Sequence, residues 1–129
     1  MTGYSDEVWR LFRMPEYLGD LAEADPRVST GEAGSLTSGC KVRLQLLVQS
    51  GYIADARFRA FGCPVTIACA AFTAGQLVGC SLEQARALTA AKVIDKLRLT
   101  GTQPSAALTV EDALLVALRN ADSALLSDR

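Results

Sequence analysis

Two alternating segments on either side of Ser50-Gly51 constrain the fold of this chain more than any other feature. In KVRLQLLVQ, residues 41–49, one side of an extended backbone carries the apolar side chains Val42, Leu44, Leu46 and Val48. In YIADARFRAF, residues 52–61, one side likewise carries Tyr52, Ala54, Ala56, Phe58 and Ala60. A period of two is typical of half-buried strands, and a two-residue connection between such strands predicts an antiparallel β-hairpin.

Helix signals lie on both sides of this hairpin. Ser5 is a good N-cap for an amphipathic segment that should end near Pro15, because proline cannot continue the helical hydrogen-bond ladder. After the hairpin, Pro64 suits a first helical position and Gly79 suits a left-handed cap. We therefore predict a second helix from about residue 64 to residue 78. Its inward stripe should comprise Val65, Ala68, Cys69, Phe72 and Gln76.

The last third of the chain also reads as helical. The sequence SLEQ, residues 81–84, is a capping box that predicts a helix through about Ala91. Residues 92–99 are ambiguous, and residues 100–105 interrupt the pattern. Thr109 then predicts the start of a final helix that reaches about Leu126.

Residues 25–39, DPRVSTGEAGSLTSG, hold three glycines and no sustained period, so we expect a long connection there. Helices that flank a β-hairpin predict an α+β fold, with a small antiparallel sheet and helices packed on one of its faces. The length of 129 residues predicts one domain over residues 1–129.

Charge and hydropathy argue against two classes of partner. The net charge of −1 lacks the basic excess that phosphate backbones require. The longest apolar run, residues 63–78, is too short and too polar to span a bilayer, and the acidic first residues do not resemble a secretory signal. We therefore expect a cytoplasmic protein that binds neither nucleic acid nor membranes.

Four cysteines and no histidine define the available chemistry. In the cytoplasm, cysteines are more often free, metal-bound or catalytic than paired in structural disulfides. Cys63 directly precedes a helix N-terminus, whose dipole stabilises a thiolate. Cys40 stands at the other open end of the hairpin, so the pairing of the strands should bring the two thiols together.

The remaining cysteines have weaker functional interpretations. Cys69 lies on an apolar stripe, where it is expected to fill space or to serve as a reserve ligand. Cys80 precedes a helix cap and is interpreted as a small apolar residue. The spacing of the four cysteines matches neither a zinc ribbon nor a Cys-x-x-Cys redox motif.

Three segments resemble the IscU/NifU-type iron–sulfur cluster scaffold family: GxxxSGCKVRLQL, IADARFRAFGC and PVTIACAAFTAGQLVGCSLEQA. The resemblance covers nearly the whole chain. It implies the α+β fold of that family and a role as a binding protein rather than an enzyme. It also implies a [2Fe–2S] cluster on three cysteines and an aspartate, sulfur supplied by a cysteine desulfurase, and transfer of the cluster to apo-protein acceptors.

The ligand positions of the family are only partly kept. Cys63 matches the family's second cysteine, whereas Ser38 stands at the first and Cys40 at the aspartate. Ala106 falls at the third cysteine, with Ser105 at the adjoining histidine. The family's LPPVK segment, which recruits a chaperone, is replaced by LRLTGTQPS, so we do not expect chaperone handling.

We therefore predict that Cys40 and Cys63, with Cys69 in reserve, bind iron or a [2Fe–2S] cluster, and that zinc occupies the same thiolates in isolated protein. Clusters usually take four donors, so a homodimer or an exogenous thiol would complete the set. Two alternatives remain open. One is an adaptor that binds the assembly machinery without a cluster, and the other is a thiol protein that carries a persulfide on Cys63.

Overall fold

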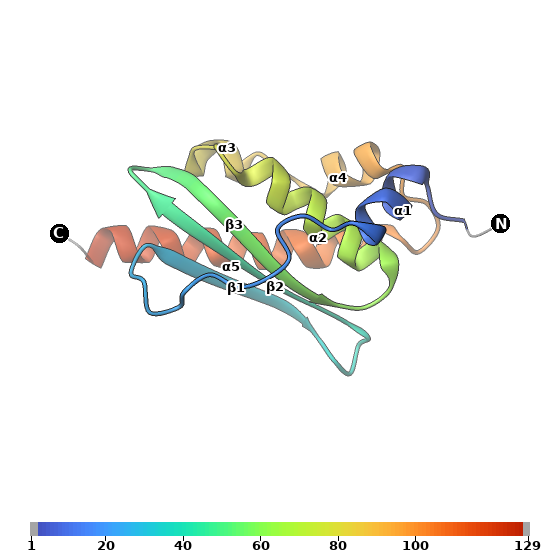
Figure 1. Ribbon diagram of the computed structural model, residues 1–129, viewed down its shortest axis with the longest axis horizontal. Helices are drawn as coiled ribbons and strands as arrows, with labels where there is room; N and C mark the ends of the chain where they lie inside the picture. The colour runs from blue at the N-terminus through green and yellow to red at the C-terminus, as the bar shows by residue number, and fades with distance from the viewer. Residues whose placement is uncertain (1–2, 128–129) are drawn as a thin grey trace.

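The computed structural model describes residues 3–127, the side chains of residues 123–127 excepted. Its elements are α1 (Asp6–Arg13), β1 (Val28–Ser35), β2 (Cys40–Gln49), β3 (Tyr52–Phe61), α2 (Pro64–Leu77), α3 (Leu82–Arg86), α4 (Ala90–Leu97) and α5 (Pro104–Ser127). The three strands form one antiparallel sheet in the order β1-β2-β3. Helices α2 and α5 pack against the sheet (Figure 1). The predicted α+β class is confirmed.

The predicted hairpin forms the centre of the sheet. Ser50 and Gly51 both adopt left-handed backbone angles, as a two-residue hairpin turn requires. Val42, Leu44 and Leu46 are fully buried beneath the helices. One continuous cluster of buried side chains joins this face of the sheet to α2, α4 and α5.

The expected long connection over residues 25–39 is wrong for most of its length, because residues 28–35 form β1. Glycine and serine have low strand propensity, but pairing with β2 and packing beneath α5 override it. Gly31 shows why glycine is used there. A Cβ atom at this position would lie 2.0 Å from the Ala113 carbonyl oxygen of α5. The glycine therefore marks the close approach of a helix to a strand.

The predicted alternation of β3 is correct only in its second half. The register with β2 shifts at Leu47/Val48, so one extra residue of β3 bulges and reverses the side-chain pattern. Ile53 is consequently buried, whereas Tyr52 is 56% exposed. Ala56 and Phe58 face the core as predicted.

Helix α2 agrees with prediction in extent, and Gly79 adopts φ 91° just beyond its end. Its burial is wider than one stripe and includes Thr66, Ala70 and Thr73, whereas Gln76 is exposed. A helix enclosed by the sheet, α1 and α5 has no single inward face.

The boundaries of the later helices differ from prediction. The capping box at Ser81 is present, but its helix ends at Arg86, and the ambiguous segment forms α4. Helix α5 begins at Pro104 instead of Thr109. The Thr109 hydroxyl donates to the Ser105 carbonyl within the helix, so it does not act as a cap.

The N-terminal segment before α1 is hydrogen-bonded to the end of α4 and to the connection between α4 and α5. The Ser5 hydroxyl accepts from the Val8 amide of α1 and donates to the Leu97 carbonyl at 2.6 Å. The Gln103 side chain donates to the Gly3 carbonyl at 2.9 Å. These bonds place residues 3–5 beside the start of α5.

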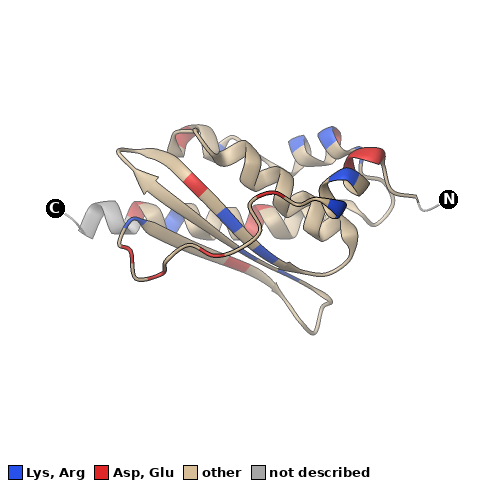
Figure 2. Cartoon of the chain, viewed as in Figure 1, with Lys and Arg blue, Asp and Glu red and all other residues tan. Residues whose placement is uncertain are grey.

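Acidic and basic residues are interspersed along the strands and helices (Figure 2). Within the described part of the chain, no helix is long and apolar enough to cross a bilayer.

Candidate functional site

Two thiols meet where the hairpin leads into α2. Cys40 is the first residue of β2, and Cys63 is the N-cap of α2, two residues after the end of β3. The register pairs Lys41 with Phe61, so the two cysteines emerge from neighbouring strand ends, at the end of the sheet near α1 (Figure 1). Metal binding by this pair stays a prediction.

A single hydroxyl lies between the two sulfur atoms. The Oγ1 atom of Thr66 is 3.5 Å from the Sγ atom of Cys40 and 3.7 Å from the Sγ atom of Cys63. The two sulfurs are therefore separated by no more than the sum of these distances. A metal bound at about 2.3 Å by each sulfur could bridge them once side-chain rotation brings both sulfurs within reach of it.

The thiols line a cavity of about 300 Å³. Its floor is the first turn of α2, with Val65 and Thr66. The start of α5 and the N-terminal segment complete the wall, with Gln103 and Tyr4 among their residues. Cys63 is exposed and Cys40 is half-buried, so the cavity is open to solvent on the Cys63 side.

The environment of Cys63 favours its ionised form. Burial raises the pKa of this thiol, but hydrogen bonding by the Thr66 amide and hydroxyl, with the Val65 and Cys63 amides, outweighs burial and lowers the pKa below its ordinary value of 9.0. The amides of the first turn of α2 and the Thr66 hydroxyl thus converge on this sulfur, at the helix end where an anion is favoured.

Cys69, the predicted reserve ligand, is not among the residues that line the cavity, and its role as a ligand stays a prediction. It is fully buried in the core, and burial, followed by the Cys63 and Cys40 sulfurs, raises its pKa to about 12. Among the described residues, no group of three or more His, Cys, Asp or Glu side chains is placed to hold a metal ion. The apolar stripe on which Cys69 lies explains its packing role.

Cys80 lies at the opposite end of the sheet. Its carbonyl accepts from the Ile53 amide near the hairpin turn, and its thiol donates to the Gln76 carbonyl at 3.0 Å. The structure therefore separates Cys80 from the thiol pair.

Ser105 and Ala106 line the thiol cavity at the start of α5. Ala106 is buried and offers no donor atom. The Ser105 hydroxyl donates to the Thr102 carbonyl within its own turn. The wall where the resemblance places the family's third cysteine and histidine thus faces the thiols but carries no metal ligand.

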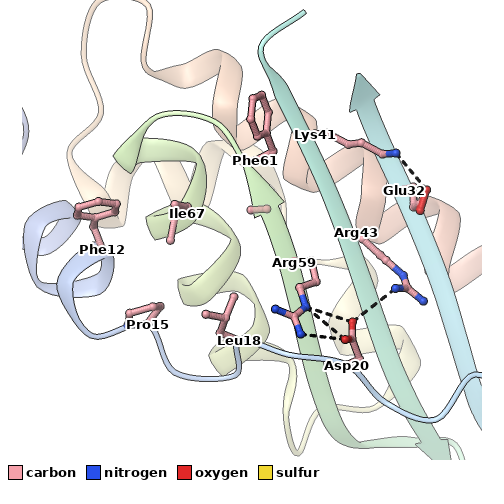
Figure 3. Close-up of a pocket in the computed structure, with 11 residues that line it drawn as sticks. Phe12, Pro15, Leu18, Asp20, Glu32, Lys41, Arg43, Arg59, Phe61 and Ile67 are labelled. Carbon is pink, nitrogen blue, oxygen red and sulfur yellow. Dashed lines mark hydrogen bonds and ion pairs between the residues drawn. The ribbon is translucent and has the colours of Figure 1, made fainter. Parts of the chain in front are cut away.

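A larger groove of about 690 Å³ runs over the sheet face that the helices leave uncovered (Figure 3). Phe12, Leu18 and Ile67 form one wall, and charged side chains form the other. The charges pair with one another: Asp20 accepts from Arg59 at 3.0 Å and from Arg43 at 3.5 Å. This groove contains neither thiol, so we place the candidate site in the smaller cavity.

Thr66 and Gln103 are among the cavity residues that the sequence analysis did not single out. Thr66 lies three residues after Cys63, and this spacing puts its side chain in the first turn of α2 beside the N-cap. That signal was available in the sequence. Gln103 had no such signal, because its place depends on the docking of the N-terminal segment against α5.

A small α+β fold that brings an exposed thiol and a half-buried thiol together at the junction of a β-hairpin and a helix defines a class of thiol proteins suited to soft metals and sulfur. The family described as the NifU-like N terminal domain matches residues 3–123, and the chain belongs to this family. The resemblance found in the sequence is confirmed.

Named relatives agree with this membership. The chain is 32% identical over 118 residues to a protein of Azotobacter vinelandii named iron-sulfur cluster assembly scaffold protein IscU, with 91% of this chain and 92% of the relative covered. It is 31% identical to a protein of Drosophila melanogaster named iron-sulfur cluster assembly enzyme IscU, with 89% and 75% covered. The crystal structure of the SUF-system protein of Fervidobacterium islandicum AW-1 shares the fold, with a TM-score of 0.74 and 19% identity over 90% of this chain and 96% of that one.

Proposed function

We propose that this chain is an iron–sulfur cluster assembly scaffold that holds iron or a [2Fe–2S] cluster as cargo on Cys40 and Cys63. The observation that carries the proposal is that both sulfur atoms contact the same hydroxyl, that of Thr66, in a cavity open to solvent. Thiolates are the usual ligands of such clusters. Membership of the NifU-like family supports the same role.

Two of the usual four cluster donors must come from elsewhere. Among the described residues, Cys40 and Cys63 are the cysteines that line the cavity, whereas Cys69 lies in the core. A second copy of the chain can supply an equivalent pair, and a small exogenous thiol is the other source. In isolated protein, zinc is expected on the same thiolates.

Sulfur reaches the site by thiol exchange with the persulfide of a cysteine desulfurase. The Cys63 thiolate attacks the outer sulfur of that persulfide, a new S–S bond forms, and the desulfurase cysteine leaves as a thiolate. No net oxidation occurs, because a persulfide is consumed and another is formed on Cys63. The lowered pKa of Cys63 favours this step.

This role is one of binding and transfer rather than turnover of a substrate. The proposed partners are a cysteine desulfurase and apo-protein acceptors. We expect no binding to nucleic acid, to membranes or to the chaperone that recognises the LPPVK segment of the family. We propose a cytoplasmic location on the strength of four free cysteines, which persist in a reducing compartment.

The cavity offers two thiols where a cluster usually takes four donors. This shortage of ligands favours a second candidate function, that of a carrier of persulfide sulfur without a metal. Mass spectrometry of Cys63 after incubation with a cysteine desulfurase and cysteine tests it. One added sulfur on Cys63 in metal-free protein, together with no bound iron after reconstitution, would favour the carrier over the scaffold.

Anaerobic reconstitution with ferrous iron, cysteine and a cysteine desulfurase tests the scaffold itself. We expect the visible absorption of a cluster in the wild-type chain, its loss in Cys63→Ser, and its retention in the matched control Cys80→Ser. Equal absorption in the Cys63→Ser chain would refute the proposed ligand.

A further inference from the structure

Thr66 is a buried hydroxyl residue whose side chain has an unusual set of neighbours. It is 2% exposed and lies in the first turn of α2. A threonine in a helix commonly donates its hydroxyl hydrogen to a carbonyl three or four residues earlier. Here the hydroxyl instead contacts the sulfurs of Cys40 and Cys63, at 3.5 and 3.7 Å.

The surrounding backbone is shaped around this side chain. Gly62 has φ 152°, and a Cβ atom there would lie 2.7 Å from the Thr66 Oγ1 atom and 3.0 Å from its Cβ atom. Only glycine therefore lets the chain turn from β3 into α2 directly over Thr66. The Thr66 amide also donates to the Cys63 carbonyl at 2.9 Å, which fixes the turn that carries the thiol.

Metal binding changes what this hydroxyl can do. In the free protein either thiol can share a hydrogen with the Thr66 oxygen. When Cys40 and Cys63 bind a metal as thiolates, both thiols lose their hydrogens. The Thr66 hydroxyl then carries the one hydrogen left for hydrogen bonding between these three polar groups. In any hydrogen bond with a bound thiolate it is then the donor, and the two sulfurs are the contacts that its side chain makes in the structure.

We propose that Thr66 is a positioning residue of the thiol site, whose hydroxyl aims Cys40 and Cys63 at one metal and donates a hydrogen bond to one of the bound thiolates. The inference rests on the proposed function, since it assigns a role to Thr66 only where the two cysteines bind a metal. One hydroxyl hydrogen serves two sulfurs, so the two ligands are made unequal. The sulfur without the hydrogen bond is the more electron-rich ligand.

Cobalt(II) alone, added to the full metal-free chain under anaerobic conditions, tests the inference. Thr66→Val keeps the branched shape and removes the hydroxyl, and Thr66→Ser keeps the hydroxyl. Groups that orient metal ligands are typically worth tenfold or more in affinity. We expect Thr66→Val to bind cobalt about tenfold more weakly, with its thiolate-to-cobalt absorption moved to longer wavelength, and Thr66→Ser to restore both properties.

Thr73 supplies a matched control. It lies in the same helix, is 2% exposed like Thr66, and its hydroxyl has no hydrogen-bond partner among the described residues. Thr73→Val should therefore leave the cobalt affinity and spectrum unchanged. Should Thr66→Val not fold, as judged by circular dichroism, Thr66→Ala is measured instead and is expected to show the same weakening and shift.

Wild-type affinity and an unshifted spectrum in the chain that lacks the Thr66 hydroxyl would overturn the inference and leave the proposed function standing. A change of equal size in Thr73→Val would also overturn it, because the effect would then belong to helix packing. Absence of cobalt binding by the wild-type chain would overturn both the inference and the proposed metal site.

Discussion

Replacing Gly31 with alanine should destabilise the fold severely, although it adds a single methyl group. Gly31 lies in β1 and pairs with Leu44 of β2, beneath α5. The new Cβ atom would lie 2.0 Å from the Ala113 carbonyl oxygen and 2.4 Å from the Ala117 nitrogen, whereas ordinary contact begins at 3.4 Å. Both neighbours are backbone atoms, so relief requires a movement of the whole helix relative to the sheet.

Such overpacking typically costs about 1–3 kcal/mol, and more when backbone must move. We therefore expect Gly31→Ala to lower the free energy of unfolding by about 3 kcal/mol or more, measured by urea unfolding followed by circular dichroism. Gly75→Ala is the matched control. Its Cβ atom would make ordinary contact with Tyr17 at 3.4 Å, and alanine in a helix should add about 0.5–1 kcal/mol. If the unfolding free energy of Gly31→Ala matched or exceeded that of the wild type, the assigned packing of α5 on β1 would be refuted.

Three further predictions concern the thiol cavity and a helix cap. Ala106→Cys adds a third thiol to the cavity wall and should tighten zinc binding at least about tenfold, or about 1.4 kcal/mol, in chelator competition; unchanged affinity would contradict the placement of that wall. Because the pKa of Cys63 is lowered, its alkylation by iodoacetamide should persist at pH values where free cysteine is largely protonated, and should fade only as the pH falls through the lowered pKa. Cys69, with a pKa of about 12 and full burial, should stay unmodified until the chain unfolds; peptide mass spectrometry checks both thiols, and early modification of Cys69 would contradict its burial. Ser81→Ala removes the capping hydrogen bond that the Ser81 hydroxyl accepts from the Gln84 amide and should cost about 1 kcal/mol of unfolding free energy; equal urea midpoints would show that the cap is not needed.

Local sequence patterns predicted the elements whose own residues determine them. The hairpin from Lys41 to Phe61 has strong alternation and a turn of the expected length, and α2 is bounded by Pro64 and Gly79. Strand β1 could not be predicted in this way. Its glycines and serines indicate a loop, and they form a strand only because β2 pairs with them and α5 requires a residue without a side chain at Gly31.

The candidate site likewise has a part that local sequence patterns predicted and a part that they could not predict. The pairing of the hairpin strands predicted that Cys40 and Cys63 would approach one another, since register follows from the strand pattern. The absence of Cys69 from the cavity wall could not be predicted in this way, because its position on α2 allows either inward packing or approach to the thiols. The contact of the Thr66 hydroxyl with both sulfurs depends on the turn at Gly62, whose backbone angle no sequence pattern specifies.

Iron and acid-labile sulfide per chain, measured after anaerobic reconstitution, test the central claim most directly when two double variants are compared. Cys40→Ser with Cys63→Ser removes the thiol pair, and Cys69→Ala with Cys80→Ala removes the other two cysteines and leaves the pair intact. The account predicts that the first variant retains neither iron nor sulfide and that the second retains wild-type amounts of both. Equal retention by the two variants, or loss in the second alone, would contradict it.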